Sequence, residues 1–197
     1  MGTIEVICGP MFSGKTEELI RRLKRAVIAR RKVQVFKPRI DTRYDAEAVV
    51  SHSQQKMLST VVEKAAEVLE KLALDVEVVG IDEVQFLGPD IVPVVKDLAS
   101  RGLRVVVAGL DQDFRGQPFV PMPELLAEAE YITKELAICV VCGQPASRSQ
   151  RLVQDEAQVH IGAGDAYEAR CRKCFSPDPV SATQTAHQEL LPFLRGA

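Results

Sequence analysis

The sequence predicts an α/β fold: a mostly parallel β-sheet with flanking helices, followed by a small zinc-ribbon-like domain. Apolar segments typical of buried strands, at residues 3–8, 76–81 and 103–110, alternate with helical patterns, and this alternation is typical of a parallel sheet. A glycine-rich turn joins the first strand to the first helix. Two C-x-x-C pairs, separated by 28 residues, follow nearer the end of the chain, and such pairs are typical of zinc ribbons.

The composition favours one globular core that acts on a small molecule. A chain of 197 residues can build one α/β core with a small appendage. The net charge of −2 and the pI near 6.0 give no electrostatic footprint for nucleic acid. No apolar run approaches the roughly 18 residues of a membrane span, and residues 1–20 leave no room for a signal peptide. We therefore expect a cytoplasmic protein with a small substrate, no nucleic acid partner and no membrane contact.

The turn after the first strand fits the phosphate-loop (P-loop) pattern G-x-x-x-x-G-K-[ST]. It consists of Gly9, Pro10, Met11, Phe12, Ser13, Gly14, Lys15 and Thr16. In such a loop, backbone N–H groups and the start of a helix surround a phosphate. Lys15 would reach the β- and γ-phosphate oxygens, and the Thr16 hydroxyl would bind Mg²⁺. A chance glycine-rich turn is the alternative, and the strand and helix on either side argue against it.

Residues 16–30 form the first predicted helix, because apolar residues recur there at helical spacing. The basic residues of this helix could form a nucleic-acid patch, but the net charge favours a solvated helix face. A second strand is predicted at 32–37, followed by a long polar connection at 38–60. A connection of that length is uncommon in a compact domain unless it is functional or mobile. Arg43, within it, can either contact a phosphate or lie in solvent.

An acidic pair at the end of a buried strand is the second part of the predicted phosphate site. A helix is predicted at 61–72 and a continuously apolar strand at 76–81, which ends in Asp82 and Glu83. In phosphate-loop enzymes such an aspartate holds Mg²⁺ through a water, and the next residue, on the alternate side of the strand, faces a different partner. An ordinary polar strand end is the alternative, but the phosphate loop in the same chain favours the functional interpretation.

The carboxyl ends of the predicted strands bring the functional segments together. A helix at 88–100 precedes the apolar strand at 103–110. Ligands of open parallel sheets bind outside the carboxyl ends of the strands. The phosphate loop, Asp82 with Glu83, and residues 111–119 are therefore expected at one edge of the sheet.

Four cysteines in two pairs predict a zinc site: Cys139, Cys142, Cys171 and Cys174. Four thiolates at this spacing suit a tetrahedral structural Zn²⁺ with no open ligand position. A redox pair is the alternative, but it would need only one C-x-x-C. The glycine-bearing segment between the pairs, tied at its base by zinc, could close over a ligand. Cys8, in the middle of an apolar strand, is expected to be a buried, inert thiol.

These features divide the chain into three parts. Residues 1–136 form the P-loop nucleotide-binding domain, which ends with a short helix predicted at 124–130. Residues 137–176 form the zinc-binding domain, and residues 177–197 form a flexible C-terminal tail.

Together the motifs resemble those of the thymidine kinases of the zinc-containing type, which occur in bacteria and in animal cytosol. The resemblance rests on the phosphate loop, on Asp41, Thr42, Arg43 and Tyr44, on residues 81–86, on Gly109, Leu110 and Asp111 with Phe114, Pro118 and Phe119, and on the cysteine pairs. It extends over residues 3–174. It implies a RecA-like P-loop core, a zinc domain whose lasso loop covers the nucleoside, and phosphoryl transfer from ATP to deoxythymidine, and also to deoxyuridine, in pyrimidine deoxynucleotide salvage.

The resemblance also implies a role for each site residue. Glu83 is the general base, Lys15 and an Mg²⁺ held by Thr16 and Asp82 stabilise the phosphates, and Zn²⁺ is structural. ATP binding is implied for Gly9, Pro10, Met11, Phe12, Ser13, Gly14, Lys15, Thr16, Asp41, Arg43, Asp82 and Gln85. Nucleoside binding is implied for Met11, Phe86, Leu110, Phe114, Phe119, Ser149, Gln158, Val159, His160, Ile161, Gly162 and Tyr167. A homotetramer and feedback inhibition by deoxythymidine triphosphate are further implications.

Two other classes of function remain open on the sequence alone. The first is a phosphate-loop ATPase whose zinc module docks nucleic acid or protein, which would need basic and aromatic residues clustered on that module. Acidic residues offset most of the basic ones there: Asp155, Glu156, Asp165 and Glu168. The second is a zinc-stapled binding module that has lost catalysis, and the intact Lys15 and Glu83 argue against it.

Overall fold

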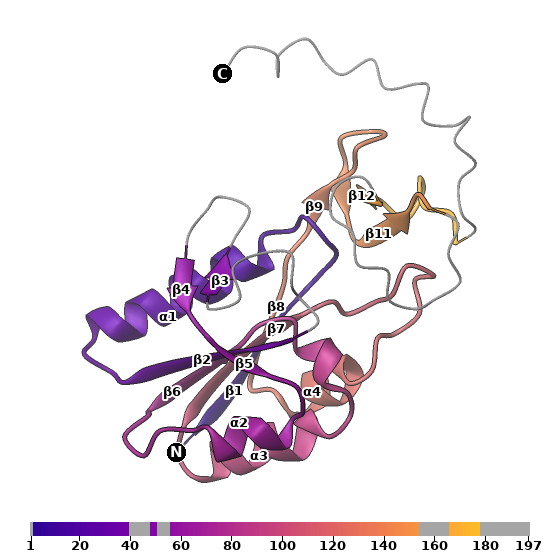
Figure 1. Ribbon diagram of the computed structural model, residues 1–197. Helices are drawn as coiled ribbons and strands as arrows, with labels where there is room; N and C mark the ends of the chain where they lie inside the picture. The colour runs from indigo at the N-terminus through magenta and orange to yellow at the C-terminus, as the bar shows by residue number, and fades with distance from the viewer. Residues whose placement is uncertain (1, 40–47, 51–55, 154–165, 178–197) are drawn as a thin grey trace.

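A six-stranded sheet forms the centre of the molecule (Figure 1). The computed structural model describes residues 2–39, 48–50, 56–153 and 166–177. All neighbouring strands of the sheet are parallel, in the order β5-β2-β6-β7-β1-β8. Their bounds are β1 Thr3–Cys8, β2 Val33–Pro38, β5 Thr60–Val62, β6 Val78–Ile81, β7 Arg104–Gly109 and β8 Tyr131–Lys134. The predicted α/β class with a parallel sheet is therefore confirmed.

Helices cover both faces of the sheet (Figure 1). Helix α1, Lys15–Ile28, lies on one face. The other face carries α2 Ala66–Glu70, α3 Ile91–Ser100 and α4 Met122–Glu128. A short 3₁₀ turn, η1 Val84–Leu87, follows β6. Within the described part of the chain, no helix is long and apolar enough to cross a membrane.

The two faces of the sheet form two apolar cores. Alternate strand residues such as Ile7, Val35 and Val106 pack against Leu19 and Leu23 of α1. The residues between them, Val6, Val79 and Val107 among others, pack against the helices of the opposite face. Since both faces are covered, the central strands are almost continuously apolar, which is why their sequence pattern predicts them well.

Three small antiparallel pairs lie outside the main sheet. Their strands are β3 Ala48–Val50 with β4 Lys56–Leu58, β9 Ala137–Ile138 with β10 Pro145–Ala146, and β11 Arg148–Arg151 with β12 Tyr167–Arg170. Cys139 and Cys142 lie between β9 and β10, and Cys171 and Cys174 follow β12. These four strands and the cysteines form the zinc module, which is described for residues 137–153 and 166–177.

The helix predicted at 61–72 is wrong over its first half. Residues Thr60–Val62 instead form β5, which pairs with β2, and Val62 is buried in the sheet core. Helix α2 begins only at Ala66. A run of β-branched side chains fits a half-buried strand better than a helix, and pairing with β2 decides the matter. The connection predicted at 38–60 likewise contains β3 and β4, and the strand β8 was not predicted.

Substitution Gly80→Ala should destabilise the fold, because β6 and α1 approach each other closely at this glycine. A Cβ atom at Gly80 would lie 2.5 Å from Leu23 Cδ1, and the Leu23 side chain is fully buried. Overpacking of this kind lowers the free energy of unfolding by about 1–3 kcal/mol. Urea denaturation measures the loss. In a Leu23→Ala background, which removes the clashing atoms, the same substitution should cost clearly less; equal costs in both backgrounds would contradict the packing argument.

Candidate active site

The carboxyl ends of β1, β6 and β7 carry the phosphate loop, Asp82 with Glu83, and Asp111. Because β7 lies between β1 and β6, these segments are neighbours at one edge of the sheet. The hydroxyl of Thr16, the last residue of the loop, donates to Asp82 Oδ2 at 3.1 Å. The structure thus brings together the three segments that the sequence placed at this edge.

The phosphate loop bends back on itself between β1 and α1. Gly9 and Gly14 adopt positive φ angles of 143° and 86°. A side chain at Gly9 would strike the Glu135 carbonyl oxygen, since its Cβ atom would lie 2.2 Å away. The Pro10 carbonyl oxygen accepts hydrogen bonds from Ser13 Oγ at 2.8 Å and from Lys15 Nζ at 2.6 Å. In this state the lysine ammonium is held by the loop itself, at the place where a phosphate would take it over.

Charges of both signs are buried around Lys15. Burial lowers the pKa of the Lys15 ammonium, and the carboxylates of Glu83, Asp82 and Asp111 oppose that shift. Burial, followed by the charge of Glu83, raises the pKa of Asp82 to about 7. A bound cation would reverse this shift, because it favours the ionised carboxylate. The adjacent oxygens of Thr16 and Asp82 are ligands of the kind that Mg²⁺ prefers.

The raised pKa of Asp82 predicts a pH dependence of stability in the absence of Mg²⁺ and nucleotide. Between the usual 3.8 and about 7 the folded protein binds more protons at Asp82 than the unfolded chain does. The free energy of unfolding therefore falls as the pH rises through this window. The side chain that Asp82→Asn introduces cannot titrate, so this variant should not show that fall. Across the window, the change in its free energy of unfolding should be smaller than that of the unchanged protein by on the order of a few kcal/mol. Urea denaturation of both proteins at several pH values measures it, and parallel pH profiles would contradict the assignment.

Glu83 is held in a fixed position at the end of β6. Its backbone lies in the left-handed region, with φ 49° and ψ 41°, which is uncommon for a residue with a side chain. Its N–H donates to Asp82 Oδ1 at 3.0 Å. The Gln85 amide nitrogen donates to Glu83 Oε2 at 2.6 Å, and the Gln85 amide oxygen accepts from the Leu110 N–H at 3.1 Å. The buried Gln85 amide thus fixes the half-buried carboxylate to the end of β7.

Aromatic side chains near the site form two groups. Phe114 and Tyr167 are buried in one cluster with Met11 packed against it. Phe86 and Phe119 make an edge-to-face pair with ring centres 6.1 Å apart. Among the residues predicted to bind nucleoside or ATP, seven lie outside the described residues: Asp41, Arg43, Gln158, Val159, His160, Ile161 and Gly162.

Two side chains near the site were not predicted as part of it. Arg151 is 1% exposed and stacks on Phe114, with its guanidinium carbon 3.6 Å from the ring centre. It also donates to the Tyr167 hydroxyl at 2.7 Å. Lys134, the last residue of β8, donates to Asp111 Oδ2 at 2.5 Å. In the sequence, only the pair Tyr131 and Ile132 could have indicated β8. Arg151 cannot be distinguished in the sequence from an exposed arginine.

The four cysteines of the zinc module lie close together. Their sulfur atoms all lie within 4.8 Å of one another, and those of Cys142 and Cys171 are 3.6 Å apart. A disulfide would bring two sulfurs to about 2.05 Å, whereas a tetrahedral ion with zinc–sulfur bonds of about 2.3 Å spaces them by about 3.8 Å. The cluster therefore fits a shared zinc ion.

The pKa values of two of these thiols favour the thiolate form, whereas contacts with neighbouring thiols raise the pKa of Cys142 and of Cys174. Burial opposes ionisation of Cys139, yet backbone N–H groups, among them those of Cys171 and Cys142, lower its pKa to about 6. The Cys174 N–H group likewise lowers the pKa of Cys171. The thiolate is the form that binds zinc. Cys8 behaves differently: burial and the charge of Asp111 raise the pKa of its thiol to about 11, as expected for an inert residue.

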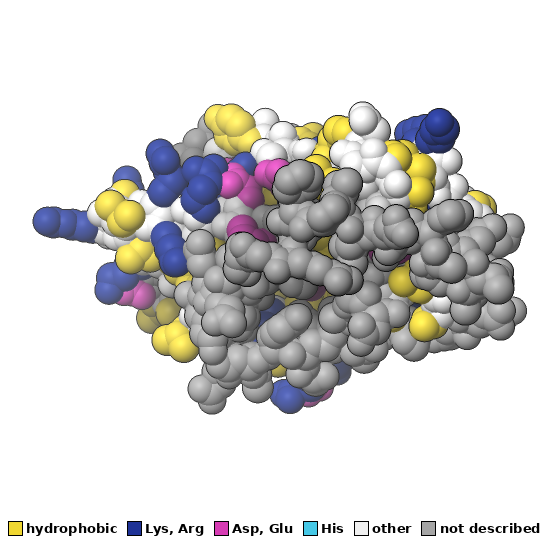
Figure 2. All heavy atoms as spheres, turned by 90° about the horizontal axis from the view of Figure 1, so that it is seen from above, with side chains coloured by type: hydrophobic (Ala, Val, Ile, Leu, Met, Phe, Trp, Pro, Cys, Tyr) yellow, Lys and Arg dark blue, Asp and Glu magenta, His cyan; other side chains and the backbone are white. Residues whose placement is uncertain are grey.

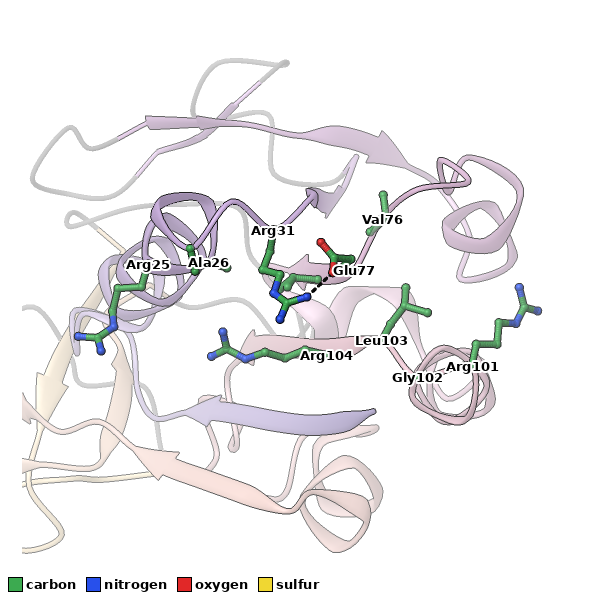
Figure 3. A pocket seen from close by; sticks show the side chains of 11 residues that line it. Arg25, Ala26, Arg31, Val76, Glu77, Arg101, Gly102, Leu103 and Arg104 are labelled. Carbon is green, nitrogen blue, oxygen red and sulfur yellow. Dashed lines mark hydrogen bonds and ion pairs between the residues drawn. The ribbon is translucent and has the colours of Figure 1, made fainter. Parts of the chain in front are cut away.

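A hollow of about 770 Å³ lies at the amino ends of the strands, at the end of the sheet opposite the phosphate loop (Figure 3). Arginines line it, but most are neutralised by acids. Arg31 pairs with Glu77 at 2.5 Å, and Arg104 with Glu5 at 2.6 Å. Figure 3 shows Arg101 pointing away from the other labelled arginines. Helices α1 and α3 end near this hollow. Arginines are common at the negative end of a helix dipole, and this position explains their presence around the hollow without any catalytic role.

The comparisons with known proteins agree with this geometry. The sequence model of the family described as thymidine kinase matches residues 2–175. A thymidine kinase of Rhodothermus sp. (strain ITI 518) is 56% identical over 185 residues, which cover 94% of this chain and 86% of that protein. A thymidine kinase of Bdellovibrio bacteriovorus is 56% identical over 182 residues, 92% of this chain and 89% of that protein.

One solved structure, domain III of the Thermotoga maritima replication initiation protein DnaA, matches with a TM-score of 0.40 and 16% identity over 67% of this chain and 54% of that one. A likeness this low says nothing of the function. The family match and the matches to the two relatives each cover nearly all of this chain. The chain belongs to the thymidine kinase family.

Proposed function

We propose that the protein transfers the γ-phosphoryl group of ATP to the 5′-hydroxyl of deoxythymidine, and also of deoxyuridine, giving ADP and the nucleoside 5′-monophosphate for nucleotide salvage. One observation carries the proposal: a carboxylate, Glu83, is held by Gln85 directly beside the phosphate site formed by Lys15, Thr16 and Asp82. Family membership and two relatives named thymidine kinase support the choice of acceptor.

On the donor side, the phosphate loop binds the triphosphate. Its N–H groups and Lys15 would surround the β- and γ-phosphates, and Lys15 would exchange the Pro10 carbonyl oxygen for a phosphate oxygen. Thr16 and Asp82 would hold Mg²⁺, which supplies positive charge to the transferred group. The resemblance adds Asp41 and Arg43 to the ATP contacts. The resemblance also places Gln85 among the ATP contacts. The hydrogen bond from its side-chain amide to Glu83 gives it a second role, because this bond holds the Glu83 carboxylate in position.

Glu83 acts as the general base of the transfer. Its carboxylate takes the proton as the 5′-hydroxyl oxygen attacks the γ-phosphorus. The new oxygen–phosphorus bond forms while the bond to the bridging oxygen breaks, and the electron pair leaves with ADP. A base fixed on one side of the phosphate site orients the attack, and the nearby positive charges stabilise the charge that develops.

The nucleoside binds between the sheet edge and the zinc module. Its pocket consists of Met11, Phe86, Leu110, Phe114, Phe119, Ser149 and Tyr167, with the lasso residues Gln158, Val159, His160, Ile161 and Gly162. A structural Zn²⁺ on Cys139, Cys142, Cys171 and Cys174 holds the module together. The family resemblance further implies a cytoplasmic homotetramer that deoxythymidine triphosphate inhibits.

A nucleic-acid-dependent ATPase fits the described surface less well. Docking would need free cations on the zinc module, but Arg151 is buried against Phe114, and Arg170 is buried in an ion pair with Glu168. Among the described residues of the module, this leaves Arg172 and Lys173 as the exposed basic side chains. Lys and Arg side chains gather at one end of the molecule in Figure 2, with Asp and Glu side chains beside them. On α1, Arg21 and Arg22 each form an ion pair with the carboxylate of Glu18. Such mixed charge favours a solvated face over a phosphate-binding one.

The test is ADP release by the purified protein with Mg-ATP and a panel of single additions. We expect release with deoxythymidine and with deoxyuridine, and little with purine nucleosides, cytidine or buffer alone. Single-stranded DNA is a separate addition. Release driven by DNA and indifferent to nucleosides would overturn the proposal in favour of the ATPase.

A further inference from the structure

The phosphate loop is bonded to the zinc module as well as to its own domain. The Met11 N–H, in the middle of the loop, donates to Ser149 Oγ at 2.9 Å. Ser149 lies on β11 of the zinc module, 138 residues further along the chain, and is 5% exposed. Because the Ser149 side chain is shielded from solvent, a water molecule cannot easily replace its hydroxyl as the partner of the Met11 N–H.

The next loop residue, Phe12, packs against the core of the zinc module. That core consists of Ala137, Cys139, Ala146, Ala169 and Cys171, with Phe12 and Cys174 packed against it. Phe12 therefore contacts the same small cluster as three of the four cysteines. Met11 and Phe12 both also pack against a second cluster, which contains Phe114 and Tyr167. Two consecutive loop residues thus lie against the zinc module.

The backbone of the loop needs this outside support. Phe12 has a φ angle of 64°, in the left-handed region that residues with a side chain rarely adopt. A residue with a side chain persists in that region only where its surroundings fix it. The bonds from Ser13 and Lys15 to the Pro10 carbonyl oxygen fix the start of the loop. The bond to Ser149 and the packing of Phe12 fix its middle.

We propose that Ser149 is a positioning residue for the phosphate loop: through its bond to Met11, the zinc module sets the shape of the loop that binds the donor phosphates. The sequence assigns Ser149 to the nucleoside pocket only. The structure adds a consequence on the donor side, which is that nucleotide affinity depends on Ser149 even when no nucleoside is present. The inference rests on the proposed function in taking a nucleoside triphosphate as the ligand of the loop.

A matched pair of substitutions separates the hydroxyl from the volume of the side chain. Ser149→Thr keeps the hydroxyl. Ser149→Val gives a side chain of nearly the same shape as threonine, but with a methyl group in place of the hydroxyl. Both are favoured in a strand, so both suit β11. Ser147→Ala, in the same module and with no described contact to the loop, is the control for loss of a hydroxyl as such.

Isothermal titration calorimetry with Mg-ADP and with a non-hydrolysable ATP analogue, in the absence of nucleoside, gives the donor-side Kd. Loss of one hydrogen bond that pre-organises a binding loop should raise this Kd about three- to tenfold in Ser149→Val. Ser149→Thr and Ser147→Ala should stay within about twofold of the unchanged protein. Zinc content and melting temperature, measured on each variant, show whether the module has remained folded.

Unchanged or tighter nucleotide binding in zinc-replete Ser149→Val would overturn the inference and leave Ser149 in the nucleoside pocket only. An equal loss in the Thr and Val variants would also overturn it, because volume rather than the hydroxyl would then matter. If Ser149→Val loses zinc, Ser149→Ala takes its place, because it removes the hydroxyl without adding volume: a raised Kd supports the inference and an unchanged Kd overturns it. The proposed function fails separately, if the unchanged protein binds nucleotide but no thymidine.

Discussion

Glu83→Gln should lower turnover by about a hundredfold or more, the usual scale for loss of a general base. The two side chains have nearly the same shape, and the amide cannot take a proton from the nucleoside hydroxyl. The affinity for ATP should change little, because the phosphate loop, not Glu83, binds the triphosphate. Loss of the Glu83 charge beside Lys15 and Asp82 removes a repulsion toward phosphate, so any change should be toward tighter binding. Steady-state kinetics and nucleotide titration measure the two effects.

The control for this change is Glu124→Gln, which makes the same chemical substitution at an exposed position on α4. It should leave both turnover and affinity unchanged. Two results would count against the role of Glu83: unimpaired turnover in Glu83→Gln, or a loss confined to the KM for ATP. In the second case the carboxylate would be a donor-side contact rather than the base.

Cys171→Ser should abolish stoichiometric zinc binding and unfold the zinc module. A serine hydroxyl is a poor zinc ligand at neutral pH, and structural zinc in small modules contributes on the order of 10 kcal/mol to folding. Among the described residues, the apolar cluster around the cysteines is small and has only alanines and cysteines fully buried, so it contributes little stability without the metal. Metal analysis after dialysis should find less than about one-tenth of a zinc ion per chain. Nucleoside binding, in which we propose that Tyr167 of the module takes part, should be lost with it.

Cys8→Ala is the matched control, because Cys8 lies on β1, outside the four-cysteine cluster, and is buried in the sheet core. It should keep one zinc per chain. Full zinc content in Cys171→Ser would contradict the four-thiolate site, and zinc loss in Cys8→Ala would show that the metal depends on the fold of the sheet rather than on these ligands.

Motifs that are continuous in sequence could be predicted, and contacts that cross the fold could not. The phosphate loop and the pair Asp82–Glu83 are short, and each follows an apolar strand, so their residue types and spacing suffice to place them. The cysteine pairs are recognisable for the same reason. The fold class also followed, because strands covered on both faces have a continuous apolar pattern.

The residues that were missed depend on which strands become neighbours. Strand β5 has three residues, too few for a periodic pattern, and only its pairing with β2 makes it a strand. Lys134 reaches Asp111 because β8 lies beside β1, which nothing in its own short segment indicates. The bond between Met11 and Ser149 joins residues 138 positions apart. Such contacts can be found only once the topology is known.

The decisive experiment follows a label from ATP to the nucleoside, and so tests whether the protein phosphorylates deoxythymidine. The protein is incubated with Mg-ATP labelled at the γ-phosphoryl group and with deoxythymidine, and the products are separated. The account predicts that the label appears on the 5′-oxygen of deoxythymidine, in an amount equal to the ADP formed, and that 5′-deoxythymidine with no 5′-hydroxyl accepts none. Label that appears as inorganic phosphate, with deoxythymidine unchanged, would contradict it.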